Sequence, residues 1–256
     1  IGVGTWQFGS KEWGYGPEYA RTTAAAILNR ALDLGVNLVD TAGTGGGPST
    51  FNVSTTAALV AAGAGCPVAK HGNRSSTSKS GSADLLEALG VNIELDAAGV
   101  GASIDEVGFG FMFAPRHHLA TSHVMPVRKE LAVRTVFNFL GPLTNPAGAR
   151  RQVIGVADRT FQESIAEALV TLGAERALVV SGDDGLDEIS ISGPTRVMRV
   201  DEGKTEELIV TPEDFGMEPA SLEDVVGGSP QENAVATLAV FDGERSARRD
   251  LVLLNA

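Results

Sequence analysis

Short apolar runs alternate with segments of helical period along most of the chain. The runs predict strands at residues 36–40, 66–70, 151–157 and 176–182, and the periodic segments predict helices at residues 54–65, 82–90 and 161–173. Strand–helix–strand repetition at this spacing predicts an α/β fold, a mostly parallel sheet with helices on its faces. Residues 186–210 are expected to add strands around an EGK turn, and residues 218–245 to be rich in loops.

The first predicted helix has hydroxyl residues at its start and glycines at its end. Hydroxyl side chains accept hydrogen bonds from the free N–H groups of a first helical turn, so we expect Ser54 or Thr55 as the N-cap. Glycine readily adopts the left-handed conformation that ends helices, so Gly63 or Gly65 is the expected stop.

A glycine-rich stretch, DTAGTGGGPSTFNVST, joins the first predicted strand to this helix. It places Gly43, Gly45, Gly46 and Gly47 at the carboxyl end of the strand. Glycines let main-chain N–H groups approach a ligand closely, and such turns before a helix form anion sites. The stretch lacks the Lys-Ser/Thr ending of a Walker A loop and the spacing of G-x-G-x-x-G, so it does not specify a nucleotide. A flexible surface linker is the alternative.

A second polar stretch, KHGNRSSTSKSGSAD, begins where the next predicted strand ends. It contains the cations Lys70, Arg74 and Lys79, together with His71, Asn73 and six serine or threonine hydroxyls. In a chain of net charge −12, this concentration of donors indicates a site for a multiply charged anion. The alternative is a solvated loop with ordinary Ser/Thr capping.

An acidic stretch, SGDDGLDEISIS, follows the predicted strand at 176–182. Its carboxylates are Asp183, Asp184, Asp187 and Glu188. Adjacent carboxylates with few nearby cations suit a hard cation that keeps several waters and bridges to substrate phosphates, which describes Mg²⁺. The spacing is not that of an EF-hand. An acidic loop alone would more often be merely solvated, but two anion-binding loops in the same chain favour the metal site.

A fourth stretch combines histidines, arginines and the Gly/Pro-shaped segment NFLGPLTNP. His117, His118 and His123 lack the spacing and the Cys partner of a zinc site. Arg128 and Arg134 are candidates for binding a carboxylate bidentately. The segment that follows them has a composition suited to the wall of an aromatic pocket.

Composition restricts partners and compartment. The chain has 256 residues, 43% of them hydrophobic, enough for one large core or for a large and a small domain. The net charge of −12 argues against non-specific binding to nucleic acids or acidic membranes. The single cysteine, Cys66, excludes an internal disulfide and fits a reducing compartment. No apolar stretch is long enough to span a bilayer and no signal peptide is recognisable, so we expect a cytoplasmic protein.

From about Asp40 to Ala256 the sequence closely resembles the anthranilate phosphoribosyltransferase family. The matching motifs are GTGG, FNVST, KHGNRS, SKSGSAD, FAPRHH, VRKELAVRTVFNFLGPLTNPA, DGLDEIS and EDFGM. The resemblance implies an α/β domain of the nucleoside phosphorylase/phosphoribosyltransferase type beside a small helical domain, usually in a homodimer. It also implies Mg²⁺-dependent transfer of the ribosyl phosphate of phosphoribosyl pyrophosphate to the amine of anthranilate, in tryptophan biosynthesis.

The resemblance assigns roles to the residues that match these motifs. The residues implied to be catalytic are Lys70, Arg128, Asp187 and Glu188, and the implied metal ligands are Ser54, Asp187 and Glu188. The residues implied to bind phosphoribosyl pyrophosphate are Gly43, Thr44, Gly45, Gly46, Asn52, Ser54, Thr55, Lys70, Asn73 and Ser82, and His71 is implied to be substrate-binding. Arg128 would meet the anthranilate carboxylate, with His118 and Pro142 lining its pocket.

The sequence departs from the family pattern in three places. The family loop reads GTGGD-G, and the residue missing after Gly46 is best placed as its Asp. Residues 1–42 resemble the opening strand–helix–strand of an aldo-keto reductase instead of the family's helical domain, and the chain stops before the family's last helices. We therefore expect a hybrid, with a reductase-like segment at 1–42 and a C-terminally truncated α/β domain at 43–256.

Other functions match parts of the sequence. A related nucleoside phosphorylase of the same fold and a weak or inactive phosphate-binding hybrid stay open as alternatives. Reductase activity is not expected, because Asp40 matches the reductase Asp but no Tyr of its DTA-x-x-YG motif follows. The remaining barrel units of a reductase are also missing.

Overall fold

A seven-stranded sheet forms the centre of the protein, in the order β3-β2-β1-β4-β5-β6-β7. The structure is a computed structural model that describes residues 38–75, 78–118 and 137–256. The strands are β1 (Val39–Gly43), β2 (Val68–Gly72), β3 (Phe109–Phe113), β4 (Arg151–Gly155), β5 (Arg176–Gly182), β6 (Thr195–Asp201) and β7 (Lys204–Val210). The pairs among β1 to β5 are parallel, whereas β6 and β7 add an antiparallel hairpin. The mostly parallel α/β fold is confirmed.

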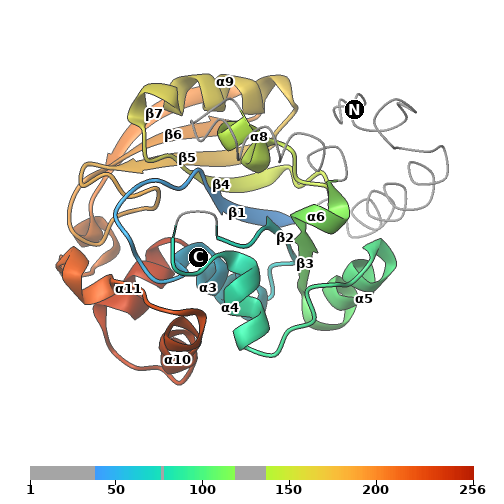
Figure 1. Ribbon diagram of the computed structural model, residues 1–256. Coiled ribbons are helices and arrows are strands. Elements are labelled where there is room, and N and C mark those ends of the chain that lie inside the picture. Colours follow the sequence, from blue (N-terminus) through green and yellow to red (C-terminus); the bar gives the residue numbers. More distant parts are fainter. Residues whose placement is uncertain (1–37, 76–77, 119–136) are drawn as a thin grey trace, which may run out of the picture.

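Helices cover both faces of this sheet (Figure 1). They are α3 (Val53–Gly63), α4 (Ser82–Ala88), α5 (Ala97–Val107), α6 (Ala114–His117), α8 (Phe137–Leu143), α9 (Gln162–Thr171), α10 (Pro230–Phe241) and α11 (Ala247–Leu254). In Figure 1, α8 and α9 lie above the sheet, and α3, α4, α10 and α11 lie below it. Among the described residues, no helix is both long and apolar enough to cross a membrane.

Alternation of apolar side chains along the strands explains why both faces are covered. In β5, Val179 packs in a cluster with Ile165 and Leu169 of α9, whereas its neighbour Val180 packs in a cluster with Val53 of α3. Successive side chains of a strand point to opposite faces, so strands that are apolar at consecutive positions need a layer on each side.

Several elements begin or end a few residues away from the sequence predictions, and one helix was not predicted. The first helix begins after Asn52, whose side chain makes no capping bond, and not at Ser54 or Thr55. The expectation of a loop-rich segment at 218–245 is wrong for α10. That helix starts with a capping box, in which Ser229 Oγ accepts from the N–H of Glu232 at 3.3 Å and the Glu232 carboxylate accepts from the N–H of Ser229 at 2.7 Å.

Candidate active site

Four neighbouring parallel strands end on a glycine at the same edge of the sheet. These residues are Gly72 of β2, Gly43 of β1, Gly155 of β4 and Gly182 of β5. The chain leaves β1 toward β2 on one side and reaches β4 on the other side, so the strand order reverses there. In open α/β sheets ligands bind outside the carboxyl ends of the strands at such a reversal. The glycine-rich, serine-rich and acidic stretches, each predicted to follow a strand, therefore lie at one edge of the sheet.

The glycine loop, residues 43–47, leaves β1 at this edge. Gly45 and Gly46 have positive φ values of 66° and 95°, which side-chain-bearing residues rarely adopt. The N–H of Thr44 donates to Gly155 O at 2.9 Å, which fixes the start of the loop. The loop thus has the backbone form of an anion-binding turn.

The acidic loop, residues 183–188, packs directly against the glycine loop. A Cβ atom added at Gly155 would overlap the backbone of Asp187, and one added at Gly47 would overlap the carbonyl of Gly185. Asp187 Oδ2 accepts a hydrogen bond of 2.7 Å from the N–H of Gly45. The glycines therefore let two segments 142 residues apart in the chain come into contact.

Two of the four acidic-loop carboxylates have structural partners. Asp183 pairs with Arg159 across the loop. Asp184 accepts from the hydroxyls of Ser190 and Ser192 and from the N–H of Leu186, so it holds the loop in shape. Asp187 and Glu188, which the resemblance assigns to the metal, stay the candidates among the four.

Lys70 lies beneath the glycine loop and not on the surface of the site. It is 1% exposed, and its ammonium donates to Thr41 O and lies 3.4 Å from Ser54 Oγ. Burial lowers the pKa of Lys70, while the nearby charges of Asp40 and Glu188 oppose the shift. The pKa of Glu188 is raised well above its usual value by burial, then by the charge of Asp187. The side chain is therefore buried in this structure, and the role of Lys70 in binding substrate stays a prediction.

Asp40 and Asn145 connect Lys70 to the segment after α8, a connection that sequence reasoning missed. Asp40 is 2% exposed and accepts from Asn145 Nδ2 at 2.8 Å. The same amide nitrogen donates to Ala69 O at 2.8 Å, which ties β1, β2 and the LTNPA segment together. Burial raises the pKa of Asp40, with Lys70 acting in the opposite direction. A buried Asp inside a predicted strand is a signal that could have indicated such a partner.

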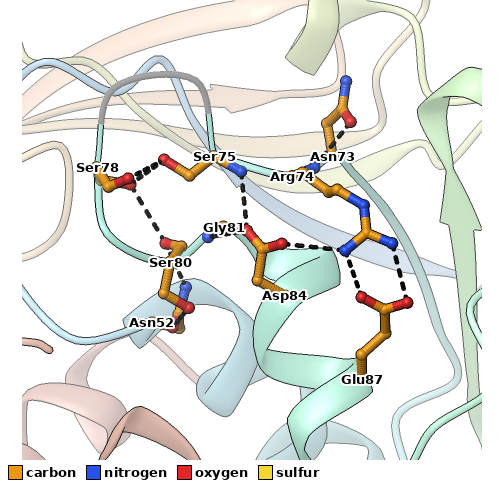
Figure 2. A network of polar contacts seen from close by, with 9 residues as sticks. All are labelled: Asn52, Asn73, Arg74, Ser75, Ser78, Ser80, Gly81, Asp84 and Glu87. Atoms are coloured by element: carbon orange, nitrogen blue, oxygen red, sulfur yellow. Dashed lines mark hydrogen bonds and ion pairs between the residues drawn. The ribbon is translucent and has the colours of Figure 1, made fainter. Parts of the chain in front are cut away.

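The serine loop, described at residues 73–75 and 78–81, is satisfied by its own neighbours (Figure 2). Asp84 of α4 accepts from the N–H groups of Ser75 (3.0 Å) and Gly81 (2.8 Å) and from Arg74 (3.2 Å). Arg74 also binds the Glu87 carboxylate through both terminal nitrogens. Of the three cations predicted to form a basic cluster in this stretch, Lys70 is buried, Arg74 is paired with carboxylates and Lys79 is exposed. The interpretation of the stretch as an anion site stays a prediction.

Other residues that the resemblance assigned to the substrate lie around these loops. Asn52 bonds Ser80 in both directions and accepts from Asn233 of α10, so its amide connects loop to helix. Thr55 is 0% exposed, so its hydroxyl does not reach the site surface. Ser82 begins α4, and Asn73 is exposed at the start of the serine loop. Of this group, Asn73 is the one presented to solvent.

His71 and His118 face one another at the other side of the site. Their ring centroids are 4.4 Å apart with an interplanar angle of 65°. Burial lowers the pKa of His118 to about 4 and the pKa of His71 well below its usual value, so both rings are neutral at pH 7. Backbone groups of Gly141 and Thr144, which flank the buried Pro142, interact with the two rings. The two rings therefore form an uncharged part of the site. The roles of His118 and Pro142 in binding anthranilate stay predictions.

Comparison with known proteins gives the family. A model described as the glycosyl transferase family, a/b domain, matches residues 35–256, and an aldo/keto reductase family model matches residues 1–46. Anthranilate phosphoribosyltransferase of Herpetosiphon aurantiacus is 54% identical over 244 residues, which is 93% of this chain and 72% of that protein. The chain belongs to the anthranilate phosphoribosyltransferase family.

Solved structures of anthranilate phosphoribosyltransferases share its fold. The Thermus thermophilus enzyme matches with a TM-score of 0.80 and 52% identity over 86% of this chain. The Saccharomyces cerevisiae enzyme in complex with PRPP and Mg matches with a TM-score of 0.78 and 35% identity over 86% of this chain. The match spans 65% and 62% of those two chains, respectively.

For this member of the anthranilate phosphoribosyltransferase family, part of the predicted acceptor site lies outside the described residues. Arg128, Arg134 and His123 belong to that part, so the assignment of Arg128 to the anthranilate carboxylate stays a prediction. Within the described residues, no group of three or more His, Cys, Asp or Glu side chains is arranged to hold a metal ion. Mg²⁺ needs only one or two carboxylates when substrate phosphates complete its shell, so Asp187 and Glu188 fit it.

Proposed function

We propose that this chain transfers the 5-phosphoribosyl group of phosphoribosyl pyrophosphate to anthranilate. The observation that carries the proposal is the contact between the glycine loop and Asp187 at the strand-order reversal, in a chain of this family. The contact brings anion-binding N–H groups and a metal-binding carboxylate within one hydrogen bond of each other. A substrate that is both a diphosphate and a magnesium chelate requires that combination.

On the donor side, the glycine loop binds the diphosphate through its N–H groups, and Asp187 and Glu188 hold Mg²⁺. Mg²⁺, when bound, neutralises the charge that grows on the departing pyrophosphate. Ser54 in the first turn of α3 and Asn73 directly after β2 orient the phosphoribosyl part. Lys70, buried below, contributes positive charge to the floor of the site without touching the substrate.

On the acceptor side, the neutral rings of His71 and His118 form an uncharged wall for the aromatic ring of anthranilate. The aniline nitrogen is already a neutral nucleophile, so the step needs positioning more than a strong base. We assign this positioning to Arg128, whose guanidinium can bind a carboxylate through two hydrogen bonds. Arg128→Ala should weaken anthranilate use roughly ten- to a hundredfold and leave phosphoribosyl pyrophosphate use nearly unchanged. Arg134→Ala tests the other candidate arginine, and a larger loss of anthranilate use there than in Arg128→Ala would reassign the carboxylate contact.

Consumption of anthranilate, followed by its fluorescence, tests the proposal. Loss of fluorescence should require the chain, phosphoribosyl pyrophosphate and Mg²⁺, and should stop when EDTA is added. Phosphorolysis of a nucleoside without use of anthranilate would favour the phosphorylase alternative. Binding of pyrophosphate with no turnover of either kind would favour a phosphate-binding hybrid, for which the loop that lacks the family's Asp after Gly46 is the first suspect.

The organisation of the whole molecule is also part of the proposal. We propose that residues 1–42 form a reductase-like segment without reductase chemistry, that residues 43–256 carry the transferase site, and that the protein acts as a homodimer. Calorimetry with NADPH and size-exclusion chromatography with light scattering test these statements. Micromolar NADPH binding, or a monomer that turns over anthranilate, would contradict them.

A further inference from the structure

The anion site of the glycine loop is occupied by a carboxylate of the protein itself. Asp187 Oδ2 accepts from the N–H of Gly45 at 2.7 Å, and a Cβ added at Gly43 would overlap the same oxygen. The side chain of Asp187 therefore lies across the end of β1, where the proposed function puts the diphosphate. A negatively charged ligand and this carboxylate compete for the same donor.

We propose that Asp187 is a built-in competitor that must leave Gly45 before a diphosphate binds, so that the site opens fully only when a divalent cation engages the carboxylate. The inference rests on the proposed function, because it names how the same site is regulated. It goes beyond a metal-ligand role for Asp187, since it predicts that this residue weakens anion binding whenever the metal is absent.

The backbone of Asp187 is anchored on both sides, so only its side chain needs to move. Before it, Asp184 is held by Ser190, Ser192 and the N–H of Leu186. After it, Ile189 exchanges two hydrogen bonds with the side chain of Asn255, at 2.8 and 2.9 Å. Rotation of one carboxylate about its side-chain bonds is fast and local compared with a loop movement.

The remainder of the glycine loop is prepared for an anion. The N–H groups of Gly46 and Gly47 have no acceptor within the described part of the chain. A phosphate that reached them would lie next to the Asp187 carboxylate, and like charges at about 4 Å repel one another even in water. Removal of Asp187 therefore frees one donor and removes one repelling charge.

Calorimetric titration with inorganic pyrophosphate tests the competition directly. In EDTA, Asp187→Ala should bind pyrophosphate roughly tenfold or more tightly than the wild type, the scale expected when a charge-assisted hydrogen bond no longer competes. Asp187→Asn keeps a neutral acceptor, so its affinity for pyrophosphate in EDTA should lie between those of the wild type and Asp187→Ala. With Mg²⁺ the order should reverse, because the wild type gains affinity and the Ala variant gains little.

Asp183→Ala is the matched control. It removes the same charge from the same loop, but its carboxylate pairs with Arg159 and not with the glycine loop. Circular dichroism checks that each variant is folded. If Asp187→Ala does not fold, Asp187→Asn, which conserves the shape of the side chain, replaces it in the test. The Gly45 amide proton, followed by NMR without ligand, should move upfield in both Asp187 variants and stay in place in Asp183→Ala.

The outcomes separate the two proposals. If the wild type binds pyrophosphate with Mg²⁺ but Asp187→Ala is no tighter in EDTA, or Asp183→Ala gains as much, the competition is overturned and the proposed function stands. If no form binds pyrophosphate under either condition, the anion site itself is absent and both proposals fail. Tighter binding of Asp187→Ala in EDTA, together with reversal in Mg²⁺, supports the competition.

Discussion

The glycine loop and the serine loop follow adjacent parallel strands at the same edge of the sheet, and both are rich in groups that donate to anions. In the serine loop these groups already have acceptors nearby, because Asp84 takes the N–H groups of Ser75 and Gly81 and Glu87 takes Arg74 (Figure 2). In the glycine loop, the N–H of Gly45 donates to Asp187, which is itself one of the two proposed metal ligands.

A sequence rich in donors is therefore not enough to predict an anion site. The number of donors alone does not predict whether a loop binds an anion, because carboxylates elsewhere in the fold can accept hydrogen bonds from those donors. The relevant quantity is the balance of donors and built-in acceptors once the chain is folded. By that measure the proposed ligand-binding surface is the glycine loop, whereas the donors of the serine loop are held by Asp84 and Glu87.

The greatest loss of activity should come from removing the two carboxylates proposed to hold the metal. Asp187→Ala combined with Glu188→Ala should lower kcat by at least about a hundredfold, the scale of losing preorganised electrostatic stabilisation. Steady-state turnover of anthranilate measures it, with EDTA-treated wild type as the comparison. Turnover that persists in the double variant would mean that the acidic loop does not hold the metal.

Removing the acceptor of the serine loop should instead cost stability. Asp84→Ala leaves two N–H groups and part of Arg74 without their partner, so the free energy of unfolding should fall by about 2 kcal/mol. Urea unfolding measures the change, and Asp84→Asn, which keeps an acceptor oxygen, should lose less. A cost below about 0.5 kcal/mol, typical of surface substitutions, would mean that the serine loop is simply solvated.

Local features of the fold were predictable from the sequence. The strand predicted at 176–182 has the same bounds in the structure, since a continuous apolar run next to a helix ending at a glycine leaves little ambiguity. The EGK turn is also found, with positive φ at Glu202 and Gly203 between β6 and β7. Helix α10 was missed, although its Ser-Pro-Gln-Glu start is a recognisable capping box.

The location of the site was predictable from the sequence, whereas the burial and the hydrogen-bond partners of its residues were less predictable. Position after a strand indicated which edge each loop occupies, because parallel strands end together. Whether Lys70 is buried, or whether Arg74 is already paired, depends on which helix packs over the loop. The contact between Gly45 and Asp187 spans 142 residues, and no local pattern encodes such a separation.

The base of the serine loop offers a pH-dependent test, because His71 precedes the loop and contacts His118. Burial lowers the pKa of His118 to about 4, whereas the unfolded chain takes up this proton near pH 6.5. The stability from the neutral ring is fully present above about pH 6.5 and is lost as the pH falls toward 4. Between pH 7 and 5, the wild type should therefore lose stability more steeply than His118→Asn, by up to about 1.4 kcal/mol per pH unit.

Urea unfolding at pH 7, 6 and 5 measures this difference. The raised pKa of Glu188 acts in the opposite direction, because that carboxyl binds its proton more readily in the fold. Glu188, His71 and His117 are present in both proteins, so subtraction of the two curves leaves the contribution of the His118 imidazole together with its interaction with the other two rings. Parallel curves for the wild type and His118→Asn would contradict the neutral state of the ring.

A much smaller change should separate the two kinds of carboxylate within the acidic loop. Asp183 pairs with Arg159 at the surface, and both side chains are about half exposed, at 53% and 42%. Exposed ion pairs contribute little, so Asp183→Asn should change the free energy of unfolding by no more than about 1 kcal/mol. Because Asp183 does not face the glycine loop, turnover and its dependence on Mg²⁺ should stay as in the wild type. A Mg²⁺ titration of activity provides the measurement. If Asp183→Asn shifted the half-saturating Mg²⁺ concentration as much as Asp187→Asn does, Asp183 would belong to the metal site and the contrast between the two residues would disappear.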